Sequence, residues 1–309
     1  MFDILAPLAA LIGIGAAWRY VKPLSASADG LQRQLFILVY SVLLPIVVFF
    51  ACRKFPLDSR AFNLLLIVGL ATAGAAAAAW FYLKQSKLPP RAQGALLLAA
   101  AIGSVEFLGL PVSGVLKNVA NWSGGRDIGV EFMLVANVLI LLTGGVFLLR
   151  GYGGLGRAKN PVDALMREPI LWAAVAGLLV GMSGMELPAF LYSTNNAVMR
   201  ALPAIMLITV GLSLQWKKEW NDQIAASLLP VAVIKLLLVP VLIYVLAKFL
   251  GGTGASVKSL MIYGALPSTL FGFILCERYK LDTNVYAAAV AFTTVLSFVV
   301  VPVLYDMAL

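Results

Sequence analysis

The chain consists of long apolar runs separated by short polar stretches, and this pattern continues over its whole length. An apolar run of about twenty residues is as long as a helix that crosses a bilayer. We expect ten such helices, numbered here as spans 1 to 10, with these bounds: 2–20, 35–52, 61–83, 92–116, 130–149, 169–184, 197–214, 224–250, 259–276 and 285–307. The pattern predicts an all-α polytopic membrane protein in contact with a lipid bilayer.

The longest polar stretch, residues 150–168, divides the chain into two sets of five spans, 1–149 and 169–309. Lysine and arginine favour the cytoplasmic side of a membrane. The loops after odd-numbered spans hold 14 of these residues, and those after even-numbered spans hold 8. We therefore expect residues 150–168 to form a cytoplasmic linker. Both termini would be periplasmic or extracellular, in a protein of the plasma (inner) membrane.

Prolines recur in the two sets at nearly one offset. Pro45 and Pro203 are 158 residues apart, and Pro111 and Pro267 are 156 residues apart. A near-constant offset is typical of an internal repeat, although apolar runs with prolines can also align by chance. Because each set has an odd number of spans, the second copy would be inverted, which is the plan of many secondary transporters.

Composition supports a membrane protein and excludes several other classes. The chain is 61% hydrophobic and 12% charged, whereas soluble domains are about one quarter charged. Its net charge of +9 is spread singly and in pairs at the ends of apolar runs, so we expect no nucleic-acid partner. It has no histidine, which excludes histidine zinc sites and Ser-His or Cys-His catalysis. We expect no catalytic residue, no metal and no cofactor.

A carboxylate, two glycines and a proline interrupt span 4 at membrane depth, where exposed polar groups are costly. We expect the helix to break at Gly109-Leu110-Pro111. The candidate site residues of this stretch are Ser104, Glu106, Phe107, Gly109 and Pro111. Desolvation favours the neutral form of a carboxyl group, so Glu106 can take up and release a proton. Alternatively, it makes a static hydrogen bond that holds the broken helix.

Lys235 is the second charged residue at membrane depth, about eleven residues inside span 8. A buried ammonium group needs an acceptor. Glu106 and the carboxylate of a bound substrate are two candidates. The alternative is a structural pairing with loosened backbone carbonyls near Pro230 or Pro240.

Span 9 is interrupted at residues 264–268, and Pro267, Ser268 and Thr269 are candidate ligands there. Two broken helices bring half-helix ends together near the bilayer midplane, which is a plan for binding substrates and ions.

Three polar residues in spans 5 and 10 occupy corresponding positions of the two sets: Asn137, Thr293 and Thr294. They line the same cavity or form ordinary interhelical hydrogen bonds. Gly177 and Gly181 form a GxxxG pattern in span 6, which favours close helix packing.

Four stretches of the chain resemble the auxin efflux carrier family. They are Gly103 to Pro111 with its Phe-Leu-Gly-Leu-Pro, Glu168-Pro169-Ile170-Leu171-Trp172, Gly264-Ala265-Leu266-Pro267-Ser268, and Thr293-Thr294-Val295-Leu296-Ser297 leading to Pro302. The resemblance covers essentially the whole chain. The bacterial branch of this family includes proteins assigned as malate and malonate permeases.

The resemblance implies two inverted five-helix repeats with broken, crossing helices 4 and 9, a fold similar to that of bile-acid sodium symporters. It also implies a scaffold of spans 1, 2, 6 and 7, a transport domain of spans 3–5 and 8–10, a homodimer, and small organic anions as substrates. One departure concerns the site. The family commonly has asparagine and glycine where this chain has Ser104 and Glu106. An added carboxylate repels an anion unless it is protonated or neutralised by Lys235.

These observations lead to a first hypothesis, which is a secondary transporter that moves a small organic anion by alternating access, with proton coupling. The alternative is a sodium-coupled symporter of the bile-acid type, with the cation held by freed carbonyls and Glu106. A third hypothesis, a membrane enzyme or sensor, is disfavoured because histidine and an extramembrane domain are absent from the sequence.

Overall fold

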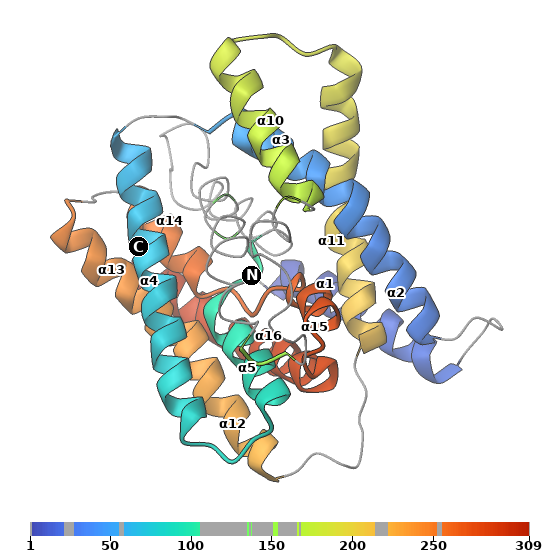
Figure 1. The fold of residues 1–309 in the computed structure, drawn as a ribbon, viewed down its shortest axis with the longest axis vertical. Helices are drawn as coiled ribbons and strands as arrows, with labels where there is room; N and C mark the ends of the chain where they lie inside the picture. Colours follow the sequence, from blue (N-terminus) through green and yellow to red (C-terminus); the bar gives the residue numbers. More distant parts are fainter. Residues whose placement is uncertain are drawn as a thin grey trace. The chain divides into compact units, whose positions relative to one another are not determined.

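The structure is a computed structural model that describes residues 2–21, 28–55, 59–105, 135, 137, 151–153, 166, 168–213, 222–251 and 255–308. Within these ranges the chain is helical between its turns, and it forms one isolated bridge but no strand. The helices are α1 (Phe2–Val21), α2 (Ala28–Leu38), η1 (Val39–Leu43), α3 (Leu44–Arg53), α4 (Ser59–Lys84), α5 (Pro90–Ala101), α10 (Pro169–Ser183), α11 (Ala189–Ser213), α12 (Asp222–Val233), η4 (Ile234–Leu238), α13 (Val239–Phe249), α14 (Ala255–Gly264), α15 (Gly272–Arg278) and α16 (Thr283–Ala308) (Figure 1).

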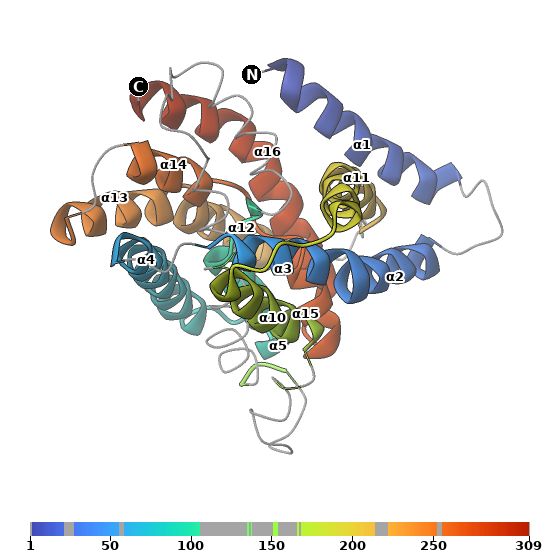
Figure 2. The same cartoon turned by 90° about the horizontal axis from the view of Figure 1, so that it is seen from above.

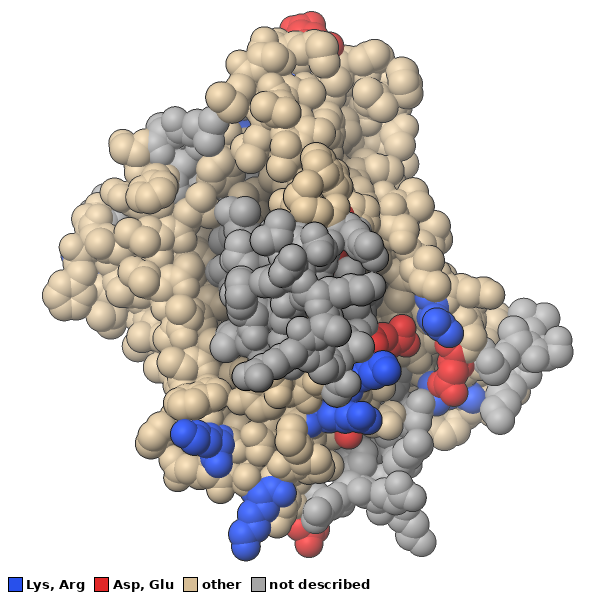
Figure 3. All heavy atoms as spheres, viewed as in Figure 1, with Lys and Arg blue, Asp and Glu red and all other residues tan. Residues whose placement is uncertain are grey.

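Four helical segments among the described residues are long and apolar enough to cross a bilayer. They are Ala28–Arg53, Phe62–Lys84, Asp222–Phe249 and Thr283–Leu304. Charged side chains are sparse on the face drawn in Figure 3, and wide areas of it carry none. The chain is therefore an all-helical, multi-pass membrane protein, as its hydropathy pattern predicts. The number of ten spans and the inverted repeat stay predictions.

The chain folds into two compact units. The first contains Leu57–Arg157 and Gln215–Leu309, and the second contains Phe2–Pro56 and Ala158–Leu214. In the first unit, α4 packs on α5 and α13, and α16 packs on α5, α12 and α15. In the second unit, α1 packs along α11, and α10 packs along α3 (Figures 1 and 2).

Two membrane helices contain a π-helical turn, and a proline explains each one. The turn η1 ends two residues before Pro45, and η4 ends two residues before Pro240. A proline ring clashes with the carbonyl four residues earlier and lacks an N–H, so the preceding turn widens to receive it. The segments α2–η1–α3 and α12–η4–α13 nevertheless run on as continuous spans.

Glycines allow the helix backbones of the second unit to touch. A methyl group on Gly15 of α1 would overlap the carbonyl oxygen of Ile208 on α11, and one on Gly211 would overlap the carbonyl of Ile12. On α10, methyl groups on Gly177 and Gly181 would overlap carbonyl oxygens of α3. This confirms the close packing that the GxxxG pattern predicts.

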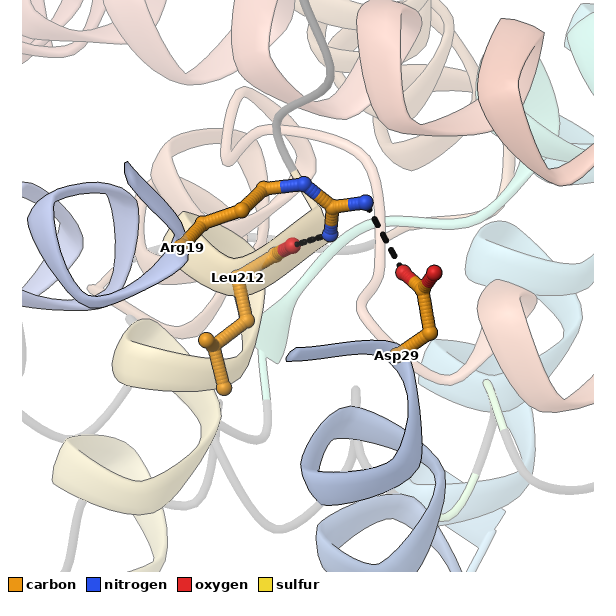
Figure 4. Close-up of polar contacts among 3 residues, drawn as sticks. All are labelled: Arg19, Asp29 and Leu212. Atoms are coloured by element: carbon orange, nitrogen blue, oxygen red, sulfur yellow. Dashed lines mark hydrogen bonds and ion pairs between the residues drawn. The ribbon is translucent and has the colours of Figure 1, made fainter. Parts of the chain in front are cut away.

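Arg19 ties the ends of three helices of the second unit together (Figure 4). Its guanidinium group donates to the carbonyl of Leu212 near the end of α11. It also forms an ion pair of 2.8 Å with Asp29 in the first turn of α2. The last carbonyls of a helix have no intrahelical donor, so a cation at this end stabilises α11.

Helix α11 begins at Ala189, eight residues before the predicted start of span 7 at residue 197. The additional turns carry Ser193 and Thr194, whose hydroxyls donate to the carbonyl of Phe190 within the same helix. Side chains that bond to their own helix are tolerated near its end. Hydropathy averaged over a window does not include such a segment in the predicted membrane helix, because its residues are polar.

The glycine contact between α1 and α11 predicts different effects for two glycines of one helix. We expect Gly15→Ala to lower the free energy of unfolding by about 1–3 kcal/mol, because the methyl group forces the two backbones apart. Gly13→Ala is the matched control, since beyond the adjacent backbone of its own helix nothing lies within 4 Å of its added methyl group. Thermal unfolding of both purified variants in detergent measures the difference. Equal midpoints for the two variants would contradict the packing.

Candidate functional site

Span 4 breaks earlier than its glycine and proline indicate. Helix α5 ends at Ala101, and Ile102 is extended, with φ −114° and ψ 130°. The predicted break at Gly109-Leu110-Pro111 lies outside the described residues and stays a prediction; the structure shows an interruption that starts at Ile102. Since α5 is buried along nearly its whole length, the break occurs inside the first unit.

The interruption of span 9 is confirmed at the predicted place. Helix α14 ends at Gly264 and α15 begins at Gly272, with an irregular segment between them. All residues from Ala265 to Phe271 are buried. An irregular backbone at membrane depth needs partners for its polar groups, and burial in protein provides them.

The two breaks lie against each other as a short antiparallel pair, with Gly103 opposite Ser268. The Ser104 N–H donates to the Pro267 carbonyl at 2.7 Å. The Thr269 N–H donates to the Ile102 carbonyl at 3.0 Å. Each broken helix therefore receives from the other a hydrogen bond that a continuous helix would have made internally.

Three hydroxyls at this crossing, those of Ser268, Thr269 and Thr293, bind backbone. Ser268 Oγ donates to the Ala99 carbonyl at 2.7 Å, and the Ser268 N–H donates to Thr293 Oγ1 at 3.2 Å. Thr269 Oγ1 accepts the Phe271 N–H at 3.2 Å and so supports the start of α15. Ser268, Thr269 and Thr293 thus hold the break in span 9.

Asn137 joins the same cluster, and Thr294 does not. The amide of Asn137 donates to the Gly103 carbonyl at 3.0 Å and is buried. It therefore bridges two spans, which agrees with the interhelical alternative of the sequence analysis. Thr294 Oγ1 donates to Val290 within α16, at 2.7 Å. That any of these residues binds substrate stays a prediction.

Lys235 reaches the crossing from η4. Its ammonium group donates to the Gly264 carbonyl at 2.6 Å, and the residue is 1% exposed. In a continuous helix the Ser268 N–H would donate to this carbonyl, but it donates to Thr293 instead. The ammonium charge thus faces the carbonyl end of α14, where the helix dipole favours a cation.

Lys235 also lies against the other break. A methyl group on Gly103 would lie 2.8 Å from Lys235 Nζ and 3.0 Å from its Cε. The helical segment Asp222–Phe249 is 28 residues long, and Lys235 is at its centre. At about 1.5 Å per residue, each end of the segment is about 20 Å away. This places one positive charge at mid-membrane depth, where the two breaks cross.

The hydroxyl of Ser104 is the open polar group of the described site. Ser104 is 2% exposed, and its Oγ has no hydrogen-bond partner among the described residues. Its neighbour Val105 is completely buried. The remaining predicted residues of this stretch, Glu106, Phe107, Gly109 and Pro111, lie outside the described residues.

Tyr286 of α16 also contacts the site, and the sequence analysis does not include it. Its hydroxyl donates to the Thr269 carbonyl, and the residue is completely buried. An aromatic residue near the predicted start of span 10 has the pattern of an interfacial anchor. The available signal was the spacing of seven residues between Tyr286 and Thr293. This spacing places both residues on one face of a helix, two turns apart.

Two interrupted helices that cross inside a membrane helix bundle are typical of secondary carriers. A family model described as "Membrane transport protein" matches residues 29–305. The chain belongs to this family, the auxin efflux carrier family. This confirms the resemblance drawn from the four sequence stretches and indicates a membrane transporter and not an enzyme.

The relatives found are also transporters by name. "Uncharacterized transporter YfdV" of Escherichia coli (strain K12) is 26% identical over 208 residues, 66% of this chain and 64% of its own length. "Uncharacterized transporter MJ1031" of Methanocaldococcus jannaschii is 26% identical over 237 residues, 72% of this chain and 68% of its own length. The chain thus aligns with slightly less than two thirds of the bacterial relative.

We expect Ser268→Ala to destabilise the protein by about 1–3 kcal/mol, because the Ala99 carbonyl loses a buried donor. The matched control is Ser193→Ala, at an exposed serine whose hydroxyl bonds to its own helix. Thermal unfolding in detergent compares the two variants. If Ser268→Ala unfolds with the wild-type midpoint, the serine does not hold the crossing.

Proposed function

We propose that this protein is a secondary active transporter that moves a small organic anion across the plasma membrane by alternating access. The observation that carries the proposal is the ammonium group of Lys235, buried at mid-membrane depth between two broken helices. A buried charge in a membrane helix is expensive, and charged groups at this depth usually belong to substrate or ion pathways.

Lys235 supplies the positive charge that a carboxylate substrate needs. Its ammonium group donates to the carbonyl of Gly264 at the end of α14, where the helix dipole favours a cation. A carboxylate at this point would form a charge-assisted hydrogen bond with the ammonium, stronger than the bond to a carbonyl. The open hydroxyl of Ser104, on the neighbouring break, adds a hydrogen-bonding group for a polar substituent of the substrate.

Coupling to protons rests on Glu106 in this proposal. The residue follows Ser104 by two positions in the sequence. A carboxyl group there binds a proton when no other cation neutralises it, and releases the proton when Lys235 is free to pair with it. A carboxylate on Lys235 and a proton on Glu106 would then be bound together, and both would leave when the two side chains pair.

The pairing of helices within each unit supports an inverted repeat. In the second unit, α1 packs on α11 and α10 packs on α3, which pairs span 1 with span 7 and span 6 with span 2. In the first unit, α4 packs on α5 and α13 packs on α14, which pairs span 3 with span 4 and span 8 with span 9. When each span is replaced by the corresponding span of the other set, the first pair of each unit becomes the second pair of the same unit, and the second becomes the first.

The division into two units supports a scaffold and a transport domain. The second unit contains spans 1, 2, 6 and 7, and the first contains the remaining spans, including both breaks. In our proposal the first unit carries the substrate as one body, and the second is the fixed scaffold through which two copies of the chain form a homodimer. Both termini lie on the outer side of the membrane, as the basic residues favour.

A sodium-coupled symporter is the weaker candidate. Freed carbonyls would have to hold the cation, yet those at the crossing accept hydrogen bonds from the protein: Ala99, Ile102, Gly103, Gly264, Pro267 and Thr269. A sodium ion beside the Gly264 carbonyl would also be repelled by the Lys235 ammonium group.

Uptake of radiolabelled malate and malonate into proteoliposomes tests the proposal. We expect Lys235→Met to reduce initial uptake about tenfold or more, because the carboxylate loses a charge-assisted hydrogen bond. Lys248→Met is the matched control, at an exposed lysine that lies over the ring of Tyr244 near the end of α13. The proposed role would be refuted if the wild-type protein took up neither anion, or if the two variants took up the anions at equal rates. A requirement for sodium would favour the symporter.

Glu106→Gln tests the coupling ion. An amide has the shape of the protonated carboxyl group but does not titrate, so we expect uptake by this variant to lose its dependence on the pH difference across the membrane. The measurement is initial uptake into proteoliposomes with and without an imposed pH gradient. Retention of the full wild-type response would exclude Glu106 as the proton carrier.

A further inference from the structure

We propose that Tyr286 is a positioning residue of the transport site, and that its hydroxyl keeps the break of span 9 in register with the break of span 4. The proposal rests on the proposed function for its transport readout, and on geometry for the role of the residue. Tyr286 lies in the first turn of α16, is completely buried, and donates its hydroxyl to the Thr269 carbonyl.

Thr269 is the residue through which the two breaks are joined to the rest of the first unit. Its N–H donates to Ile102 in the break of span 4. Its hydroxyl accepts the Phe271 N–H at the start of α15, and its carbonyl accepts from Tyr286. One residue thus links the first break, the following half-helix and α16. Because the peptide unit is planar, fixing the Thr269 carbonyl also fixes the N–H of Leu270 in the same plane.

In a continuous helix the Phe273 N–H would donate to the Thr269 carbonyl, but here it donates to Leu270. Tyr286 therefore takes the place of a helix hydrogen bond at the point where span 9 resumes. The hydroxyl acts from a different helix, so the position of the break depends on the position of α16.

The surroundings of Tyr286 are built to hold its ring in one place. The ring packs edge to face on Phe273, with centroids 5.1 Å apart and planes at 86°. On the other side, Gly272 has no side chain, and a methyl group there would overlap the Tyr286 hydroxyl. The absent side chain of Gly272 is what allows the hydroxyl to reach the backbone.

Thr293 holds the same break one residue earlier. It lies seven residues after Tyr286, on the same face of α16, and accepts the Ser268 N–H at 3.2 Å. Ser268 lies opposite Gly103, which lies against the Lys235 ammonium group. Two side chains of α16 thus fix consecutive residues of span 9, and through them the contact between the breaks beside Lys235.

Tyr286→Phe is the variant that tests the proposal, because it keeps the ring and removes the hydroxyl. Tyr244→Phe is the matched control, at an exposed tyrosine of α13. Hydrogen–deuterium exchange of the purified full-length chain in detergent follows the amides of residues 264–273. We expect exchange in this segment to be about fivefold faster or more in Tyr286→Phe, as loss of a buried hydrogen bond predicts, and unchanged in Tyr244→Phe. Unchanged exchange in both variants would overturn the proposal.

A transport readout separates positioning from simple stabilisation. With malate as the probe, we expect Tyr286→Phe to raise the half-saturating concentration about fivefold or more relative to Tyr244→Phe, in addition to the lower unfolding midpoint that loss of a buried hydrogen bond causes. A lower midpoint with unchanged half-saturation would show a structural role alone and would refute positioning. If the wild-type protein takes up no dicarboxylate, the proposed function fails, and the exchange measurement still decides whether Tyr286 holds the break.

Gly272→Ala provides a second route if Tyr286→Phe does not accumulate. Its methyl group displaces the tyrosine ring without removing any polar group. We expect the same faster exchange of residues 264–273 that Tyr286→Phe would show. Wild-type exchange in Gly272→Ala would mean that the contact between Tyr286 and Thr269 does not set the position of the break.

Discussion

A backbone inside a membrane must find a hydrogen-bond partner for every polar group, and the structure around the two breaks depends on this constraint. Where α5 and α14 end, the carbonyls that a helix would have satisfied turn to other donors. Pro267 accepts from the opposite break, Ala99 from a serine hydroxyl, and Gly264 from a lysine. The breaks can therefore exist only as a pair, each supported by the other and by helices packed around them.

The same exchange of partners explains why polar residues gather at this depth. Ser268, Asn137, Thr293 and Tyr286 come from three spans, the last two from α16, and each binds backbone of a broken helix. Their first task is structural, and it determines which polar groups remain for a ligand. The Ser104 hydroxyl has no hydrogen-bond partner among the described residues, and Lys235 brings a positive charge to the same crossing; in our proposal these two groups receive the anion.

Hydropathy predicted the four described membrane-length helices because bilayer thickness is a strong constraint on length. The end of α5 at Ala101 was not readable from the sequence, because the hydrogen-bond partners of the break lie far along the chain. Gly109 and Pro111, which carry the local sequence signal, lie outside the described residues. The depth of Lys235 was readable from sequence, but its acceptor was not, since Gly264 is 29 residues away. Tyr286 was missed for a related reason, because its contact with Thr269 depends on where span 9 stops.

The glycine contact between α1 and α11 has a consequence for how the protein is made. Gly15 and Gly211 are separated by 196 positions, and neither can complete its contact alone. At a synthesis rate of about 5–20 residues per second, α1 waits about 10–40 seconds in the membrane before α11 is available. During that time its glycine face is open to lipid or to another nascent chain. The second unit is therefore closed late, by a helix from the far half of the sequence.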